Sequence, residues 1–326
     1  MAWVRARRRR SLDALQPPEP DRAELLDLGR TTIRLWHWGD VARPPVLLVH
    51  GGWDHGRMWD GIAPRIAALG YHAVAIDVRG HGDSGRLHTS GTYWQMFQLD
   101  LAQVARHLGS GAGSTPELRA PELPAPPDPP VRVIGHSFGG GLSMSMAAGL
   151  PDYVDRVVNI DGLGPPPEMM IVEDHAASAS QWIKDAVRLW SEPAREYASV
   201  EEMAQKRKAI NTRLPIDWCR HLARHGTKPG PRGGLIWKSD QHMRLGSPGP
   251  FSDESLRAQY ARIRCPVLVL TGTEPDQWND LPVAARDARL AAIPDVRHHE
   301  VVGAGHYVHI EQPDAVLALV AEFFGS

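Results

Sequence analysis

The sequence predicts an α/β fold, with a mostly parallel sheet flanked by helices and an inserted, mostly helical segment. Short apolar runs alternate with longer stretches of helical periodicity from about residue 31 onward. Continuous apolar runs are typical of strands buried on both faces of a parallel sheet, and their alternation with helices indicates βαβ units. The alternation stops at about residue 163 and resumes near residue 254, which predicts an insertion.

The individual elements follow from these patterns. Strands are expected at residues 32–38, 45–50, 72–77, 131–135, 156–160, 267–271 and 297–302. Helices are expected at residues 58–69, 92–108, 138–150 and 313–324, and within the insertion at 176–190 and 200–210. Residues 109–130 are rich in proline, glycine and alanine, which predicts a solvated surface loop without chemistry.

The chain divides into three predicted parts. Residues 1–29 are expected to form a disordered, basic and proline-rich tail, because Arg5 and Arg7 to Arg10 cluster there. Residues 30–162 and 254–326 form the predicted sheet domain. Residues 163–253 form the predicted helical cap, whose tryptophans pack its interior or line an apolar pocket. These tryptophans are Trp182, Trp190, Trp218 and Trp237.

Composition narrows the class of protein. The net charge is −2, so neither nucleic acid nor a membrane is an expected partner. The two cysteines, Cys219 and Cys265, form no CxxC pair, which argues against a zinc site and fits a reducing compartment. No apolar run of membrane-spanning length and no signal-like segment occurs, so we expect a cytoplasmic location.

The nucleophile is predicted by Gly135-His136-Ser137-Phe138-Gly139, a G-x-S-x-G motif. An apolar strand precedes the motif and a helix follows it, which is the context that a nucleophile elbow requires. The glycines leave room for a sharp turn, and a helix N-terminus favours developing negative charge. Ser137 is therefore the predicted nucleophile.

A serine nucleophile needs a base, and His306 is the predicted one. It follows Gly303-Ala304-Gly305, in a glycine-rich loop between the last expected strand and the terminal helix. His309 lies three residues further on and is the alternative, although it falls at the approach to the helix.

The third member of a triad orients the imidazole of the base. Asp276 is the predicted acid, because it lies on the loop that leaves the strand at 267–271. Glu274 on the same loop and Asp161, at the end of the strand at 156–160, remain alternatives. Backbone amides of Gly52 and Phe138 are the predicted oxyanion hole, with Trp53 as the alternative to Gly52.

The motifs together resemble the α/β-hydrolase superfamily over about residues 30–326. They are His50-Gly51-Gly52, then the stretch from Asp77 to Ser84 (DVRGHGDS), then the Ser137 motif, then Gly305-His306. The resemblance implies an eight-stranded sheet and a bracing rather than catalytic role for Asp77, Arg79, His81 and Ser84. It also implies a serine branch of the superfamily, similar to serine-hydrolase-like proteins and esterases. Pro275 stands where many members carry the acid, so Asp276 needs one extra residue in that turn.

The predicted function is hydrolysis of a small ester-like substrate through an acyl-enzyme, without metal or organic cofactor. The same triad serves lactonases and carbon–carbon bond hydrolases, which are the alternatives. A non-catalytic small-molecule receptor on the same scaffold is a further alternative from a different class.

Overall fold

The computed structural model describes residues 17–87, 94–109, 125–170, 174–245 and 252–325. The predicted loop at 109–130 falls mostly outside the described residues, as do the N-terminal arginines. Among the described residues, every helix is too short or too polar to cross a bilayer.

An eight-stranded sheet forms the centre of the molecule, in the order β1-β2-β4-β3-β5-β6-β9-β10. Strand β2 pairs antiparallel with both β1 and β4, and the strands from β4 to β10 pair in parallel. The strands are β1 (Arg22–Asp27), β2 (Thr32–Trp38), β3 (Pro45–Val49), β4 (His72–Asp77), β5 (Val131–His136), β6 (Val154–Ile160), β9 (Val267–Gly272) and β10 (Val296–Val301). The prediction of a mostly parallel eight-stranded sheet is confirmed.

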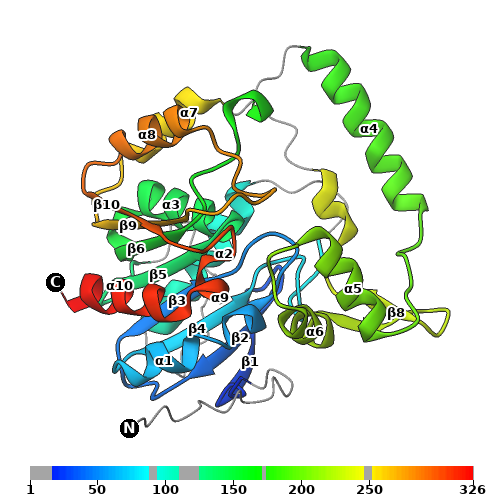
Figure 1. Cartoon of the computed structure of the whole chain (residues 1–326), viewed down its shortest axis with the longest axis horizontal. Helices are drawn as coiled ribbons and strands as arrows, with labels where there is room; N and C mark the ends of the chain where they lie inside the picture. The colour runs from blue at the N-terminus through cyan, green and yellow to red at the C-terminus, as the bar shows by residue number, and fades with distance from the viewer. Residues whose placement is uncertain (1–16, 88–93, 110–124, 171–173, 246–251, 326) are drawn as a thin grey trace, which may run out of the picture.

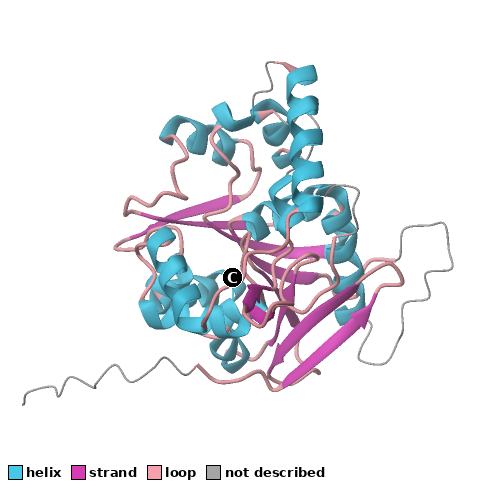
Figure 2. Cartoon of the chain, turned by 90° about the vertical axis from the view of Figure 1, so that its right-hand side faces the viewer, coloured by secondary structure: helices cyan, strands magenta, loops and turns pink. Residues whose placement is uncertain are grey.

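Helices cover both faces of this sheet (Figures 1 and 2). They are α1 (Ala63–Ala68), α2 (Trp94–Gly109), α3 (Phe138–Gly149), α7 (Asp253–Tyr260), α8 (Val283–Ala291), α9 (Val308–Glu311) and α10 (Pro313–Gly325). Strand β3 shows why its sequence is apolar throughout: Leu47 and Val49 pack into the core on one face, and Val46 and Leu48 into the core on the other. A strand in such a position has no polar side.

The predicted tail at residues 1–29 is wrong in its C-terminal part. Residues 22–27 form β1, which pairs with β2 along its whole length, and Leu26 is buried. As an edge strand, β1 needs only one buried face, so its sequence lacks the apolar run that marks the central strands. Residues 1–16 lie outside the described residues.

The expected helix at 58–69 is divided. A short 3-10 helix, η1 (Gly56–Trp59), precedes α1, and the chain turns between them at Asp60 and Gly61. A Cβ at Gly61 would lie 2.9 Å from the ring of Trp218, so the turn allows the insertion to approach closely.

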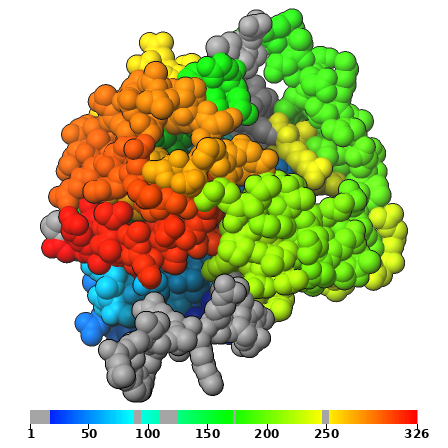
Figure 3. Space-filling model, viewed as in Figure 1, coloured from blue at the N-terminus to red at the C-terminus, as the bar shows by residue number. Residues whose placement is uncertain are grey.

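Between β6 and α7 lie the elements of the inserted segment, residues 163–253. They are the 3-10 helix η3 (Pro167–Met170), the helices α4 (His175–Ser191), α5 (Val200–Ile210) and α6 (Ile216–His225), and the 3-10 helix η4 (Gln241–Leu245). A hairpin of β7 (Thr227–Pro229) and β8 (Leu235–Trp237), which was not expected, separates α6 from η4. The α5–α6 part packs beside the sheet domain (Figures 1 and 3), and Trp218 joins the core there.

Candidate active site

Ser137 lies in the turn between β5 and α3, as the motif predicts. Its backbone has φ 53° and ψ −119°, in a region that a residue with a side chain rarely adopts. Glycines permit the turn: a Cβ at Gly135 would lie 2.4 Å from the carbonyl oxygen of Gly139, and one at Gly139 would lie 2.2 Å from that of Val49. The amide of Ser137 donates to the carbonyl of Ile160 at 2.9 Å, which joins the turn to the neighbouring strand β6.

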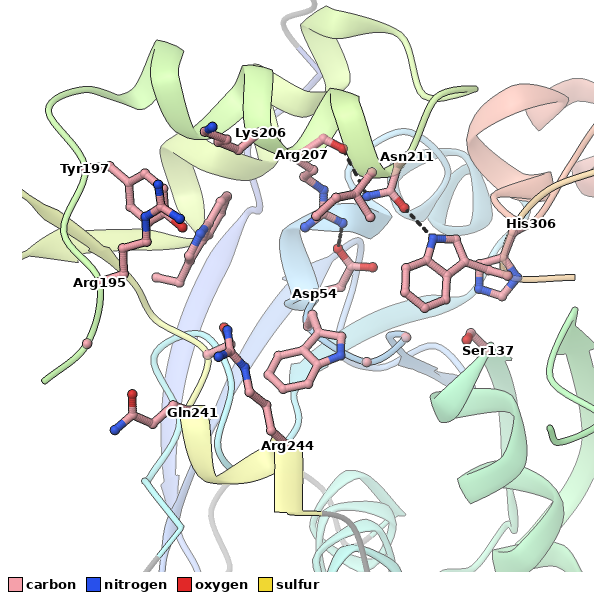
Figure 4. A pocket seen from close by; sticks show the side chains of 18 of the residues that line it. Asp54, Ser137, Arg195, Tyr197, Lys206, Arg207, Asn211, Gln241, Arg244 and His306 are labelled. Carbon is pink, nitrogen blue, oxygen red and sulfur yellow. Dashed lines mark hydrogen bonds and ion pairs between the residues drawn. The ribbon is translucent and has the colours of Figure 1, made fainter. Parts of the chain in front are cut away.

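His306 lies in the loop after β10, and its imidazole lines the same cavity as Ser137. In Figure 4 the hydroxyl of Ser137 lies just below the imidazole. Nδ1 of His306 lies 2.6 Å from Oδ2 of Asp161. With Asp161 ionised, Nδ1 carries the hydrogen and donates it, which leaves Nε2 as the nitrogen able to accept a proton.

The carboxylate beside His306 belongs to Asp161 rather than to Asp276, so the prediction that Asp276 orients the imidazole is wrong. Asp161 follows β6 directly, with φ 48°, and its amide donates to Leu270 in β9. Burial raises the pKa of Asp161 and the nearby charge of Asp276 adds to this, whereas the hydrogen bond from His306 opposes it.

Asp276 is held by its own turn. Its Oδ1 accepts from the amide of Trp278 at 3.2 Å, and its backbone amide donates to Asn279 at 2.9 Å. Its Oδ2 accepts from the backbone amide of His306 at 3.4 Å, so this hydrogen bond holds the loop of His306 and not its ring. Proline occupies position 275, and the carboxylate follows one residue later, in this turn. Glu274 accepts a hydrogen bond from Thr273 instead.

The two residues whose amides are predicted to hold an oxyanion lie close together. A Cβ at Gly52 would lie 3.8 Å from Cβ of Phe138, the residue after the serine. The alternative donor, Trp53, has φ 67° and its amide donates to Nε2 of His81 at 3.2 Å. This bond favours Gly52 over Trp53, because the amide of Trp53 already has an acceptor.

His309, the alternative base, does not line the cavity. Its ring is buried against Trp59, with ring centroids 4.6 Å apart, and against His136, at 4.8 Å. Burial, with a smaller contribution from the charge of His306, lowers the pKa of His309 to about 3. His309 is therefore a neutral core residue.

The stretch from Asp77 to Ser84 braces the loop before the site. Asp77 accepts hydrogen bonds from the amides of Gly56 and Asp83, at 2.6 and 2.7 Å. Arg79 forms a two-pronged ion pair with Asp100, at 2.6 and 2.7 Å. The structural role expected for this motif agrees with these contacts.

The cavity above Ser137 has a volume of about 660 Å³ and lies between the sheet domain and the inserted segment. Trp237 is the one of the four tryptophans named above that lines it. The sequence did not predict that Trp53, Tyr307 and Trp278 of the sheet domain line this cavity with their aromatic rings. It also predicted none of the charged residues of the lining, and of the titratable ones it predicted only His306.

A buried ion pair joins the inserted segment to the wall of this cavity. The guanidinium of Arg207, in α5, pairs with the carboxylate of Asp54, in the loop after β3. The hydroxyl of Tyr307 lies 3.1 Å from Nη2 of Arg207 and donates to Asp54 at 3.2 Å. Burial raises the pKa of Asp54, whereas the charge and hydrogen bonds of Arg207 oppose this. No motif marks these residues, which meet only in the folded chain (Figure 4).

One group in the described part of the chain has the side chains of a metal site. Asp60, His221 and His225 offer ligand atoms within 4.8 Å of one another. However, Nε of Arg57 donates to Asp60 at 2.8 Å, and its Nη1 lies 3.2 Å from His225. A guanidinium among the three ligands repels a cation, so we interpret the group as a structural polar network.

Comparison with known proteins shows what the chain is similar to. The family model described as alpha/beta hydrolase family matches residues 46–319. A probable serine hydrolase of Drosophila melanogaster is 24% identical over 302 residues, which cover 90% of this chain and 84% of that protein. A 2-(acetamidomethylene)succinate hydrolase of Mesorhizobium japonicum is 27% identical over 298 residues, which cover 91% and 93%.

Among solved structures, the thioesterase domain from the curacin biosynthetic pathway has the same fold. It superposes with a TM-score of 0.74 at 22% identity, over 92% of this chain and 98% of that domain. The sharp turn at Ser137 and the order of the strands are consistent with this fold. Because the family model matches most of the chain, the chain belongs to the alpha/beta hydrolase family.

Proposed function

We propose that this protein is a serine hydrolase that cleaves a small ester-like substrate through an acyl-enzyme. The observation that carries the proposal is the meeting, in one cavity, of Ser137 on its strained turn with a histidine bonded to a buried carboxylate. The hydrolase names of the relatives support hydrolysis in general. That the bond cleaved is an ester is part of our proposal.

In the proposed reaction, Nε2 of His306 takes the proton of Ser137 as the hydroxyl attacks the substrate carbonyl. Asp161 holds the imidazole by Nδ1 and stabilises its protonated form. The amides of Gly52 and Phe138 hold the oxyanion, each lowering the barrier by about 3 kcal/mol. His306 then protonates the leaving group, and a water molecule activated by the same imidazole releases the acyl group.

The inserted segment, in this proposal, is a cap that shapes the pocket. Tyr197, Arg207 and Trp237 of the segment line the cavity together with Ser137 and His306. Substrate choice is therefore expected to depend on residues of this segment, while the reacting groups come from the sheet domain.

Fluorophosphonate labelling and hydrolysis of p-nitrophenyl butyrate test the proposal. Ser137→Ala is expected to abolish labelling and to reduce kcat by at least about 10³-fold. Ser239→Ala is the matched control, because Ser239 lines the same cavity and has no place in the triad. A protein that still labels and hydrolyses the ester after Ser137→Ala would refute the proposal. Lactones and vinylogous diketones in the same screen test the other two chemistries of this triad.

A further inference from the structure

The walls of the cavity carry more positive than negative charge. Among the described residues, the charged side chains that line it are Asp54, Glu192, Arg195, Lys206, Arg207 and Arg244. Asp54 and Arg207 neutralise each other in their ion pair. The remaining wall holds three cations and only one carboxylate, that of Glu192.

Two of these cations, Arg195 and Arg244, differ from most arginines of the inserted segment in having no ion pair among the described residues. Five arginines there form ion pairs with acids of the described chain: Arg188, Arg207, Arg213, Arg220 and Arg232. Over the described ranges, the arginines of the segment without an ion pair are Arg195, Arg224 and Arg244, and two of these three line the cavity. Two of the three arginines that have no ion pair in the described part of the segment therefore lie where a ligand can reach them.

Aromatic rings hold both guanidinium groups. The guanidinium carbon of Arg195 lies 5.2 Å from the ring centre of Tyr197, and that of Arg244 lies 5.9 Å from the ring centre of Trp53. A cation–π contact favours this position of the guanidinium group and uses none of its N–H donors. A carboxylate accepts two parallel hydrogen bonds from such a group.

The positions of these cations set the shape of the ligand. Figure 4 shows Arg195, Lys206 and Arg244 on the opposite side of the pocket from Ser137 and His306. A ligand that reaches both must be extended, with its scissile bond at one end and its charge at the other. Glu192, which also lines the cavity, repels a dianionic phosphate more strongly than a single carboxylate.

We infer that the cavity takes esters that carry a carboxylate at the end remote from the scissile bond. Arg195 and Arg244 bind this carboxylate, and Lys206 adds to the attraction. The inference rests on the proposed function, since it assigns the other end of the ligand to Ser137.

Binding to the inactive Ser137→Ala protein tests the charge preference without turnover. Monomethyl glutarate is compared with dimethyl glutarate by titration calorimetry at low ionic strength. The half-ester is expected to bind at least tenfold more tightly than the neutral diester. Arg195→Gln and Arg244→Gln, each added to Ser137→Ala, are expected to reduce this preference at least fivefold. Arg224→Gln is the matched control, because Arg224 also lacks an ion pair in the described chain and does not line the cavity.

Equal affinity for the two ligands, or a preference that survives both substitutions, would overturn the inference. An equal loss in the Arg224→Gln protein would also overturn it, since it would reflect net charge rather than a site.

Turnover by the unmodified protein separates this inference from the proposed function. The two substrates are p-nitrophenyl hydrogen glutarate and p-nitrophenyl pentanoate, and the glutarate is expected to have the higher kcat/KM through a lower KM. Hydrolysis of both esters without any preference, together with equal binding, would refute the carboxylate site and leave the hydrolase standing. Binding preference without hydrolysis of either ester would support the site and refute the esterase.

Discussion

His306 and Asp161 are joined by a short hydrogen bond, with Nδ1 of the imidazole 2.6 Å from Oδ2 of the carboxylate. The bond connects the loop after β10 to the end of β6, which neighbours the strand that carries Ser137. An asparagine amide in place of this carboxylate can donate a hydrogen bond to Nδ1, which favours the imidazole tautomer with its hydrogen on Nε2. In that tautomer Nε2 cannot accept a proton. We predict that Asp161→Asn lowers kcat/KM for p-nitrophenyl butyrate by about 10³- to 10⁴-fold with little change in fold.

The matched substitution is Asp276→Asn. The hydrogen bond from His306 to Asp276 comes from the backbone amide and not from the imidazole, so we expect a loss below tenfold. Circular dichroism and the urea midpoint of each variant verify that the protein is folded. A larger kinetic loss in Asp276→Asn than in Asp161→Asn would return the role of the acid to Asp276.

The meeting of Ser137 and His306 in one cavity was predictable because their sequence signals are local. The sequence around Ser137 contains the strand, the turn glycines and the helix in one continuous stretch, and His306 follows its own glycine-rich loop. The acid was not predictable in this way. Asp161 and Asp276 follow the adjacent strands β6 and β9, whose carboxyl ends lie at the same edge of the sheet. Only the path of each loop decides which carboxylate reaches the imidazole.

The walls of the cavity were the least predictable part. Asp54, Arg207 and Tyr307 come from three distant stretches of sequence and meet only after the inserted segment has packed. Arg195 and Arg244 look like ordinary surface residues in the sequence. Their place in the cavity wall and the aromatic ring beside each become visible only in the folded chain. The edge strand β1 was missed for a related reason, since its stability comes from pairing with β2 rather than from its own apolar content.

The close approach of α3 to β3 predicts a steric effect at Gly139. A Cβ there would lie 2.2 Å and 2.5 Å from the carbonyl oxygens of Val49 and His50. We expect Gly139→Ala to lower the free energy of unfolding by about 2 kcal/mol or more and to disturb the loop after β3, which contains Gly52. Gly149→Ala at the other end of the helix is the control, because a Cβ there meets no atom within 4 Å. Urea unfolding of both variants measures the difference, and equal stabilities would contradict the steric account.

The buried pair of Asp54 and Arg207 predicts a large effect on stability. Arg207→Met leaves the carboxylate of Asp54 buried without its cation, which costs about 3–5 kcal/mol. The double substitution Asp54→Asn and Arg207→Met removes both charges, so we expect it to be more stable than Arg207→Met alone. Arg188→Met, which breaks the exposed pair with Asp185, is expected to cost less than about 1 kcal/mol. Thermal or urea unfolding that ranks these variants in another order would contradict the prediction.

The buried imidazole of His309 predicts a dependence of stability on pH. Its pKa in the folded protein is lowered to about 3, mainly by burial, against about 6.5 in an unfolded chain. As the pH falls below about 6.5, the unfolded state binds a proton that the native state does not bind, so stability is lost progressively down to about pH 3. At pH 5 this one group lowers the free energy of unfolding by about 2 kcal/mol relative to its value at neutral pH.

His309→Leu removes the titrating group and keeps the site apolar. Both ring nitrogens of His309 lack a hydrogen-bond partner within the described chain, so an apolar side chain costs no bond described there. We expect the variant to gain about 2 kcal/mol relative to the parent protein between pH 7.5 and pH 5, measured by urea unfolding at each pH. Other buried histidines, such as His81 with a pKa of about 4, titrate in both proteins and cancel in the comparison. Parallel stability curves would show that His309 takes up its proton as readily in the native state as in the unfolded chain, which the apolar contact with Trp59 disfavours.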